Sequence, residues 1–152
     1  VFVGNAEGVD HALSGRSRIW SAAVCMARTH PLNGVGARGF REAFPACDAK
    51  DGALAAWGTG PALHAHQIVL EVLSETGGIG LLLWLAGAAM AWRAWRYADD
   101  RARDGARPAM LALVVSVFPL NTHLAAYSTF WGGVLLLLAA LYAGSLLGRD
   151  PA

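Results

Sequence analysis

The side chains best suited to chemistry in this 152-residue chain are arginines and histidines near glycine-rich turns in its first half. Guanidinium groups bind phosphate oxygens through paired, charge-assisted hydrogen bonds, and backbone N–H groups of a glycine-rich turn can join them. A histidine can accept a proton at neutral pH, because its unperturbed pKa is about 6.5. Together these groups can stabilise a diphosphate leaving group and deprotonate an attacking hydroxyl. The residues are Arg16, Arg18, Arg38, Arg41, His64 and His66.

Each of these residues also has a structural interpretation. Single arginines in a loop segment next to a membrane are commonly solvated or contact lipid headgroups. His64 and His66 do not share a helical face, so a two-histidine metal site on a helix is not expected. Glu71 and Glu75 do share one, and they either line a cavity or mark a membrane interface. The sequence predicts no metal and no other cofactor.

The elements that position these residues have the composition of a membrane protein. Charged residues make up only 15% of the chain, and hydrophobic residues make up 55%. No charge lies between Glu75 and Arg93, or between Arg107 and Arg149. These stretches fit one membrane span and then two spans with a turn. We therefore expect an all-α, polytopic helix bundle with short helices in an outer loop region, rather than a soluble protein with apolar core helices. The net charge of +1 gives no argument for a nucleic-acid partner.

Residues 1–66 are predicted to form the outer loop region. A helix should start with Ser14 as its N-cap and end before Pro31, which cannot continue it. The chain from Arg41 to Leu63 should be irregular, because it is rich in glycine and proline. A second helical stretch should begin near Ala62 and be interrupted at Gly77. The apolar face expected for the first helix is Ile19, Trp20, Ala23, Val24 and Ala27.

Residues 67–97 are predicted to form the first transmembrane helix with its outer extension. Residues 98–107 form a basic loop, 108–148 a transmembrane hairpin and 149–152 a tail. Within the hairpin we expect spans near 109–120 and 130–147, with a turn near Pro119 to His123. The positive-inside rule places the basic loop and the tail in the cytoplasm, and residues 1–66 on the opposite side. The arginines that decide this are Arg93, Arg96, Arg101, Arg103 and Arg107.

Two features of the outer region bear on its surroundings. Cys25 and Cys47 either form a disulfide, if this region is extracytoplasmic, or are two small buried apolar side chains. The first residue is Val1 and no signal-peptide pattern follows it, so we expect a cut inside a longer protein. Three spans make a poor bundle alone, and further N-terminal transmembrane helices are therefore expected as partners, together with membrane lipid.

Three motifs occur in order between Ser14 and Leu85. They are Ser-Gly-Arg-x-x-x-Trp from Ser14, His-Pro-Leu-x-Gly-Val-Gly from His30, and His-x-His-x from His64 before Glu-Thr-Gly-x-Ile-Gly. The series resembles the shared domain of O-antigen ligases and O-antigen polymerases. The resemblance implies an inverting, metal-independent transfer of a glycan from undecaprenyl diphosphate to an acceptor hydroxyl. The acceptor would be lipid A-core or a growing polysaccharide, at the periplasmic face of the bacterial inner membrane.

The same resemblance implies roles for the candidate residues. Arg16 would bind the diphosphate, and His66 would act as base or orient the acceptor; Gln67 replaces the asparagine usual after this histidine. A further essential arginine would lie upstream, so these 152 residues should be inactive alone. The sequence does not show whether the chain resembles the ligases, the polymerases or the protein-glycosylating members of this family. Weaker candidates for substrate binding are Arg18, Arg38, Arg41 and His64.

The competing interpretation is a non-enzymatic transport or scaffold component of polysaccharide export. It explains the spans and the basic loop equally well. It does not explain a long outer segment that holds Arg16, His66 and the glycine turn together. An enzyme should bring Arg16 and His66 toward one outward-facing cavity.

Overall fold

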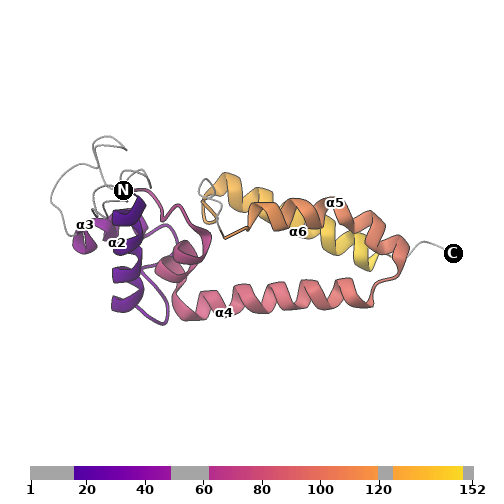
Figure 1. The fold of residues 1–152 in the computed structure, drawn as a ribbon, viewed down its shortest axis with the longest axis horizontal. Helices are drawn as coiled ribbons and strands as arrows, with labels where there is room; N and C mark the ends of the chain where they lie inside the picture. Colours follow the sequence, from indigo (N-terminus) through magenta and orange to yellow (C-terminus); the bar gives the residue numbers. More distant parts are fainter. Residues whose placement is uncertain (1–15, 49–61, 120–124, 149–152) are drawn as a thin grey trace, which may run out of the picture.

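The computed structural model describes residues 16–48, 62–119 and 125–148. Within these ranges the chain forms five α-helices and no strand, which confirms the all-α prediction. α2 and α3 gather at one end of the long helix α4, and α5 and α6 run back along it as a hairpin (Figure 1). The helices are α2 (Arg16–Thr29), α3 (Phe40–Cys47), α4 (Ile68–Tyr97), α5 (Asp100–Ser116) and α6 (Thr129–Leu147).

Two of these helices, α4 and α6, are long and apolar enough to cross a bilayer. Core helices of soluble proteins can meet the same criterion, but they bury their apolar side chains. Here the side chains face outward instead: Leu83 is 68% exposed and Leu136 is 74% exposed. Exposing so many large apolar groups to water is unfavourable, whereas lipid accommodates them. This exposure favours membrane helices.

The basic segment is helical for most of its length, so the loop predicted over 98–107 is wrong for residues 100–107. The Asp99 side chain accepts a hydrogen bond from the Ala102 N–H and caps α5, and Asp100 lies in the first turn. The Arg103 guanidinium donates to the carbonyl oxygens of Trp95 and Arg96 at the end of α4. The link between α4 and α5 is therefore short, and the helix predicted near 109–120 lies at 100–116 instead.

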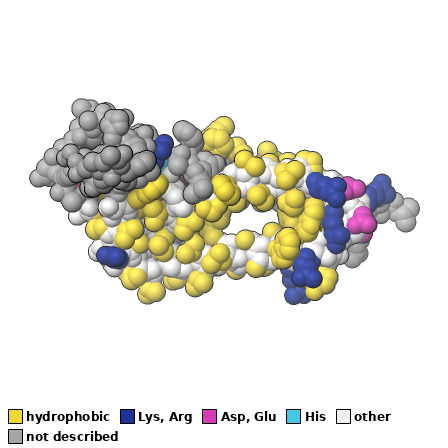
Figure 2. All heavy atoms as spheres, viewed as in Figure 1, with side chains coloured by type: hydrophobic (Ala, Val, Ile, Leu, Met, Phe, Trp, Pro, Cys, Tyr) yellow, Lys and Arg dark blue, Asp and Glu magenta, His cyan; other side chains and the backbone are white. Residues whose placement is uncertain are grey.

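α4 contacts the α5–α6 hairpin near both of its ends. At the end away from α2, the Tyr142 hydroxyl donates to the Ala91 carbonyl over 2.8 Å. At the other end, the hydroxyls of Thr76 and Tyr127 lie 3.0 Å apart. Between these contacts Figure 2 shows an opening bordered by hydrophobic side chains, and arginines gather where α4 meets α5. The arginine-rich end of the molecule is thus opposite the end that carries α2 and α3.

The outer helices differ in detail from the sequence prediction. α2 ends before Pro31, as predicted, but its proposed N-cap Ser14 lies outside the described residues. Its buried face is rotated from the predicted one, because Val24 is 36% exposed. The residues buried on α2 are Ile19, Ala22, Ala23 and Met26.

α3 was not predicted, because Pro45 disfavours a helix and the segment from Arg41 had been expected to be irregular. The helix forms because Phe40 and Phe44, one turn apart, pack together into the same core as α2. α4 begins at Ile68 rather than near Ala62, where Gln67 accepts a hydrogen bond from the Leu70 N–H. The interruption predicted at Gly77 is confirmed by its non-helical φ of 65° and ψ of −165°.

Candidate functional site

The glycine-rich loop after α2 lies against the break in α4. The N–H of Val35 donates to the Ser74 carbonyl over 2.9 Å, and the N–H of Gly36 donates to the Glu75 carbonyl over 2.9 Å. In return, the N–H of Gly78 donates to the Pro31 carbonyl over 2.8 Å. The N–H of Ile79 donates to the Leu32 carbonyl over 3.1 Å. The second and third sequence motifs therefore bind each other through backbone hydrogen bonds.

Two glycines make this close approach possible. Gly34 has a φ of 63°, and a Cβ there would lie 2.5 Å from both Glu75 O and Thr76 N. Gly77 has a φ of 65°, and a Cβ there would overlap the Leu32 carbonyl group. Each glycine thus combines a left-handed backbone with a surface that leaves no room for a side chain.

This arrangement overturns one part of the sequence prediction. The loop was expected to offer its backbone N–H groups to a phosphate. The N–H groups of Val35 and Gly36 instead donate to α4, so they are already satisfied within the chain. These glycines hold the outer region together, and the Val35 and Gly36 N–H groups are not available to a phosphate.

Glu71 and Glu75, one turn apart on α4, are buried carboxylates that bind the backbone of other segments. Glu75 is 2% exposed, and its Oε2 accepts a hydrogen bond from the Arg38 N–H. Glu71 is 1% exposed, and its Oε1 accepts from the Tyr127 N–H over 3.3 Å, just before α6. The two glutamates connect α4 to the parts of the chain on either side of it. That they also line a cavity or mark a membrane interface stays a prediction.

Arg16 opens α2, and Trp20 follows one helical turn later. The Nε atom of Arg16 and the Nε1 atom of Trp20 are both buried, and neither has a hydrogen-bond partner. A buried donor left unpaired costs about 1–3 kcal/mol, so such groups in native proteins call for an explanation. These two residues are the arginine and the tryptophan of the first motif, Ser-Gly-Arg-x-x-x-Trp, and their unpaired N–H groups are suited to bind an oxygen-rich ligand.

His64 and His66 are brought together in the segment that leads into α4. Their ring centroids lie 3.9 Å apart, and His66 adopts a left-handed backbone with a φ of 52°. Burial, together with the smaller effect of the neighbouring His66, lowers the pKa of His64 to about 4. His64 is therefore neutral at pH 7, and its buried Nε2 has no hydrogen-bond partner. The structure thus distinguishes the environments of these two histidines, which the sequence alone did not.

The three other predicted arginines fall into two groups. Arg18 forms a bidentate ion pair with Asp48, in which Nε and Nη2 contact the two carboxylate oxygens. This guanidinium ties α2 to the end of α3, and its predicted contact with a substrate stays a prediction. Arg38 and Arg41 are exposed, at the end of the glycine-rich loop and in the first turn of α3.

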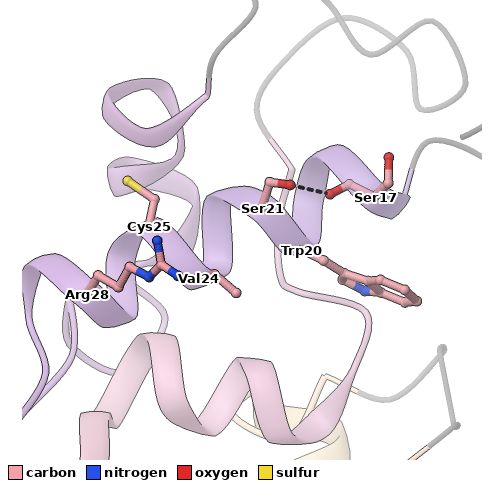
Figure 3. A pocket seen from close by; sticks show the side chains of 6 residues that line it. All are labelled: Ser17, Trp20, Ser21, Val24, Cys25 and Arg28. Carbon is pink, nitrogen blue, oxygen red and sulfur yellow. Dashed lines mark hydrogen bonds between the residues drawn. The ribbon is translucent and has the colours of Figure 1, made fainter. Parts of the chain in front are cut away.

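The outward face of α2 carries a shallow groove with a volume of about 480 Å³. Figure 3 shows Trp20 and Ser17 at one end of the groove and Arg28 toward the other. Neither Arg16 nor His66 lines it, so their expected meeting in one cavity stays a prediction. The lining residues are Ser17, Trp20, Ser21, Val24, Cys25 and Arg28.

Comparison with protein families gives a match over residues 2–85, to the O-antigen ligase family. The chain belongs to the O-antigen ligase family. Members of this family are membrane proteins of a glycan ligase class, with lipid-linked glycans and polysaccharide acceptors as substrates in general. Comparison with curated proteins gave no match, and comparison with solved structures gave none either.

The matched region of this O-antigen ligase family member ends within α4. It contains every residue predicted for the site, from Arg16 to His66, and both glycine motifs. α5 and α6 lie beyond it. The residues that carry the family resemblance are therefore those of the outer region and the α4 break against which it packs.

A disulfide between Cys25 and Cys47 joins α2 to α3 in this O-antigen ligase family member. The Cα atoms lie 5.7 Å apart, within the usual range for a disulfide. Of the two alternatives open from the sequence, the structure shows the disulfide and not two buried thiols. The bridge closes a segment that includes the whole glycine-rich loop.

Proposed function

We propose that this chain is part of a membrane glycosyltransferase that moves a glycan from undecaprenyl diphosphate to an acceptor hydroxyl. The proposed location is the periplasmic face of the bacterial inner membrane, with lipid A-core or a growing polysaccharide as acceptor. The observation that carries the proposal is the O-antigen ligase match over residues 2–85, the segment that contains all the candidate residues.

The unpaired polar atoms support roles for individual residues. Arg16 lies at the N-terminus of α2, where the helix dipole also favours an anion, and its Nε is unpaired. We assign it to the diphosphate, with the exposed Arg38 and Arg41 as further cations. Guanidinium groups can neutralise a diphosphate leaving group without a metal ion.

The histidine pair supplies the proposed base. His66 takes the proton of the acceptor hydroxyl while the hydroxyl oxygen attacks the anomeric carbon of the glycan. The bond from that carbon to the diphosphate oxygen breaks, the configuration inverts, and undecaprenyl diphosphate leaves. His64 stays neutral beside His66, so it adds no positive charge that would oppose protonation of its neighbour.

Two features at opposite ends of the molecule support the proposed orientation. The disulfide lies at the α2–α3 end, and disulfides persist in oxidising compartments such as the periplasm. The arginines cluster at the α4–α5 end, the kind of segment that stays in the cytoplasm (Figure 2). Both features favour the candidate site on the outer side of the membrane.

The test uses the complete protein in its host membrane. We would substitute Arg16→Ala and His66→Ala separately, with Arg28→Ala as control, because Arg28 is an exposed arginine of the same helix. Membrane levels are checked by blotting, and surface polysaccharide is followed together with undecaprenyl-linked precursor.

We expect the first two variants to lose mature glycan and accumulate precursor at normal protein levels, while Arg28→Ala behaves like the unmodified protein. Normal glycan in both Arg16→Ala and His66→Ala would refute the proposed site. That result would favour the transport or scaffold interpretation.

A further inference from the structure

The Glu75 carboxylate is bound by the backbone of the loop that it faces, and the charge of Arg38 also interacts with it. Its Oε2 accepts the Arg38 N–H over 2.5 Å, and the Phe40 N–H also hydrogen-bonds the carboxylate. Its own carbonyl oxygen accepts the Gly36 N–H over 2.9 Å. The side chain is 2% exposed, so it does not reach a substrate itself. One buried residue of α4 thus binds the chain at Gly36 and Arg38 in the loop and at Phe40, the first residue of α3.

The backbone at Arg38 needs such support. Its φ of 64° is left-handed, a conformation disfavoured for any residue with a Cβ. An arginine held in this conformation indicates that the surroundings impose it. Arg38 is followed by Gly39, the N-cap of α3, which makes no side-chain capping hydrogen bond. The Glu75 carboxylate, reaching the first helical N–H at Phe40, takes the place of that cap.

We propose that Glu75 is a positioning residue for glycan transfer, because its buried carboxylate sets the direction in which the Arg38 guanidinium faces the diphosphate. The inference rests on the proposed function. It assigns a task to a residue of the third motif that the chemistry of transfer does not otherwise use. Arg38 alone has no geometric reason to hold one direction, since its side chain is exposed and its backbone is strained.

Glu71 provides a matched comparison. It is equally buried, lies one turn earlier on the same helix, and also accepts a backbone hydrogen bond. Its partner is Tyr127, on the side of α4 that faces the hairpin. Loss of Glu71 should therefore weaken the fold without acting through Arg38.

The experiment is a pair of double-mutant cycles on the complete protein in lipid nanodiscs, with an undecaprenyl-diphosphate-linked glycan as donor. One cycle combines Glu75→Gln with Arg38→Gly, and the other combines Glu71→Gln with Arg38→Gly. Glycine is chosen because it adopts a φ near 64° without strain, so the backbone is kept while the guanidinium is removed. Glu75→Ala is compared with Glu75→Gln, which retains one carbonyl acceptor.

We expect Glu75→Ala to lower kcat/KM about 10- to 100-fold, mostly through a higher KM for the donor, and Glu75→Gln to recover part of it. In the Arg38→Gly background, adding Glu75→Gln should lower kcat/KM by less than about twofold. Glu71 acts independently of Arg38, so the fold losses in kcat/KM from Glu71→Gln and Arg38→Gly should multiply in the double variant. Losses for Glu75→Gln and Arg38→Gly that multiply would overturn the proposal, as would an unchanged kcat/KM in Arg38→Gly. An unmodified protein that transfers no glycan from this donor would instead refute the proposed function.

Discussion

Replacement of Gly77 by alanine tests whether the two glycine motifs hold the outer region together. The φ of 65° and ψ of −165° belong to a region that is essentially limited to glycine, and occupying it with alanine costs about 1–3 kcal/mol. The new Cβ would also overlap the Leu32 carbonyl and lie 2.6 Å from Asn33 N. Both neighbours are backbone atoms, so a side-chain rotation cannot relieve the overlap.

Relief requires the loop to move away from α4. This movement would break the hydrogen bonds from Gly78 N–H to Pro31 O and from Ile79 N–H to Leu32 O, at about 1 kcal/mol each. The sum for Gly77→Ala is then about 3–5 kcal/mol, a large share of the roughly 5–15 kcal/mol by which a domain is stable. For a chain of this size, such a loss lowers Tm by about 6–20 °C.

The assay is thermal unfolding of the detergent-solubilised protein, followed by tryptophan fluorescence. The matched control is Gly87→Ala, which lies in the same helix with nothing within 4 Å of an added Cβ. Helix propensity makes that change neutral or stabilising by about 1 kcal/mol. If Gly77→Ala left Tm where Gly87→Ala leaves it, the paired-motif reasoning would be refuted.

Three other predictions follow from the described contacts. Cys25 should resist thiol labelling in unfolded, non-reduced protein, and Cys25→Ser should cost about 3 kcal/mol in unfolding experiments; labelling without reductant would contradict the disulfide. The lowered pKa of His64, about 4, means that only the unfolded state gains this proton as pH falls from about 6.5, so stability should decline toward pH 4. In the His64→Asn variant, Tm should fall less steeply between about pH 6.5 and pH 4. An unchanged slope of Tm against pH would contradict the assignment of this decline to His64. Glu71→Ala should lower the free energy of unfolding by about 1–3 kcal/mol by leaving the Tyr127 N–H unpaired, whereas the exposed Glu42→Ala should stay within about 0.5 kcal/mol.

Local signals in the sequence were sufficient for the parts of the fold that depend on local physics. Proline at position 31 ends α2, glycine at position 77 breaks α4, and the uncharged stretches become long helices. The boundaries of α5 were wrong because Asp99 and Asp100 act as helix-start residues, although their charge suggested a loop. The pattern Asp-Asp-Arg-Ala-Arg was itself the signal that could have corrected this, since acidic residues favour the first turn of a helix.

The organisation of the site was harder to predict from the sequence, because it depends on contacts between segments that are distant in the chain. Gly34 and Glu75 lie far apart in the chain, and neither motif shows that it is the binding partner of the other. The roles of Arg18 and Arg38 diverge for the same reason: one meets Asp48, and the other is exposed with its backbone held by Glu75. The left-handed backbone of His66 and the buried, unpaired Nε2 of His64 likewise depend on the folded chain, which the local sequence does not display.

The pattern of hydrogen bonding divides the family motifs into two kinds of residue. The glycines and Glu75 satisfy their polar groups inside the chain, so substituting them should act first on stability or position. Arg16, Trp20 and His64 each keep a buried nitrogen without a partner, which is unfavourable for folding alone. Such unpaired groups are tolerated where a ligand completes them, and this is the physical reason to place the proposed donor diphosphate against side chains such as Arg16 rather than against the Val35 and Gly36 N–H groups.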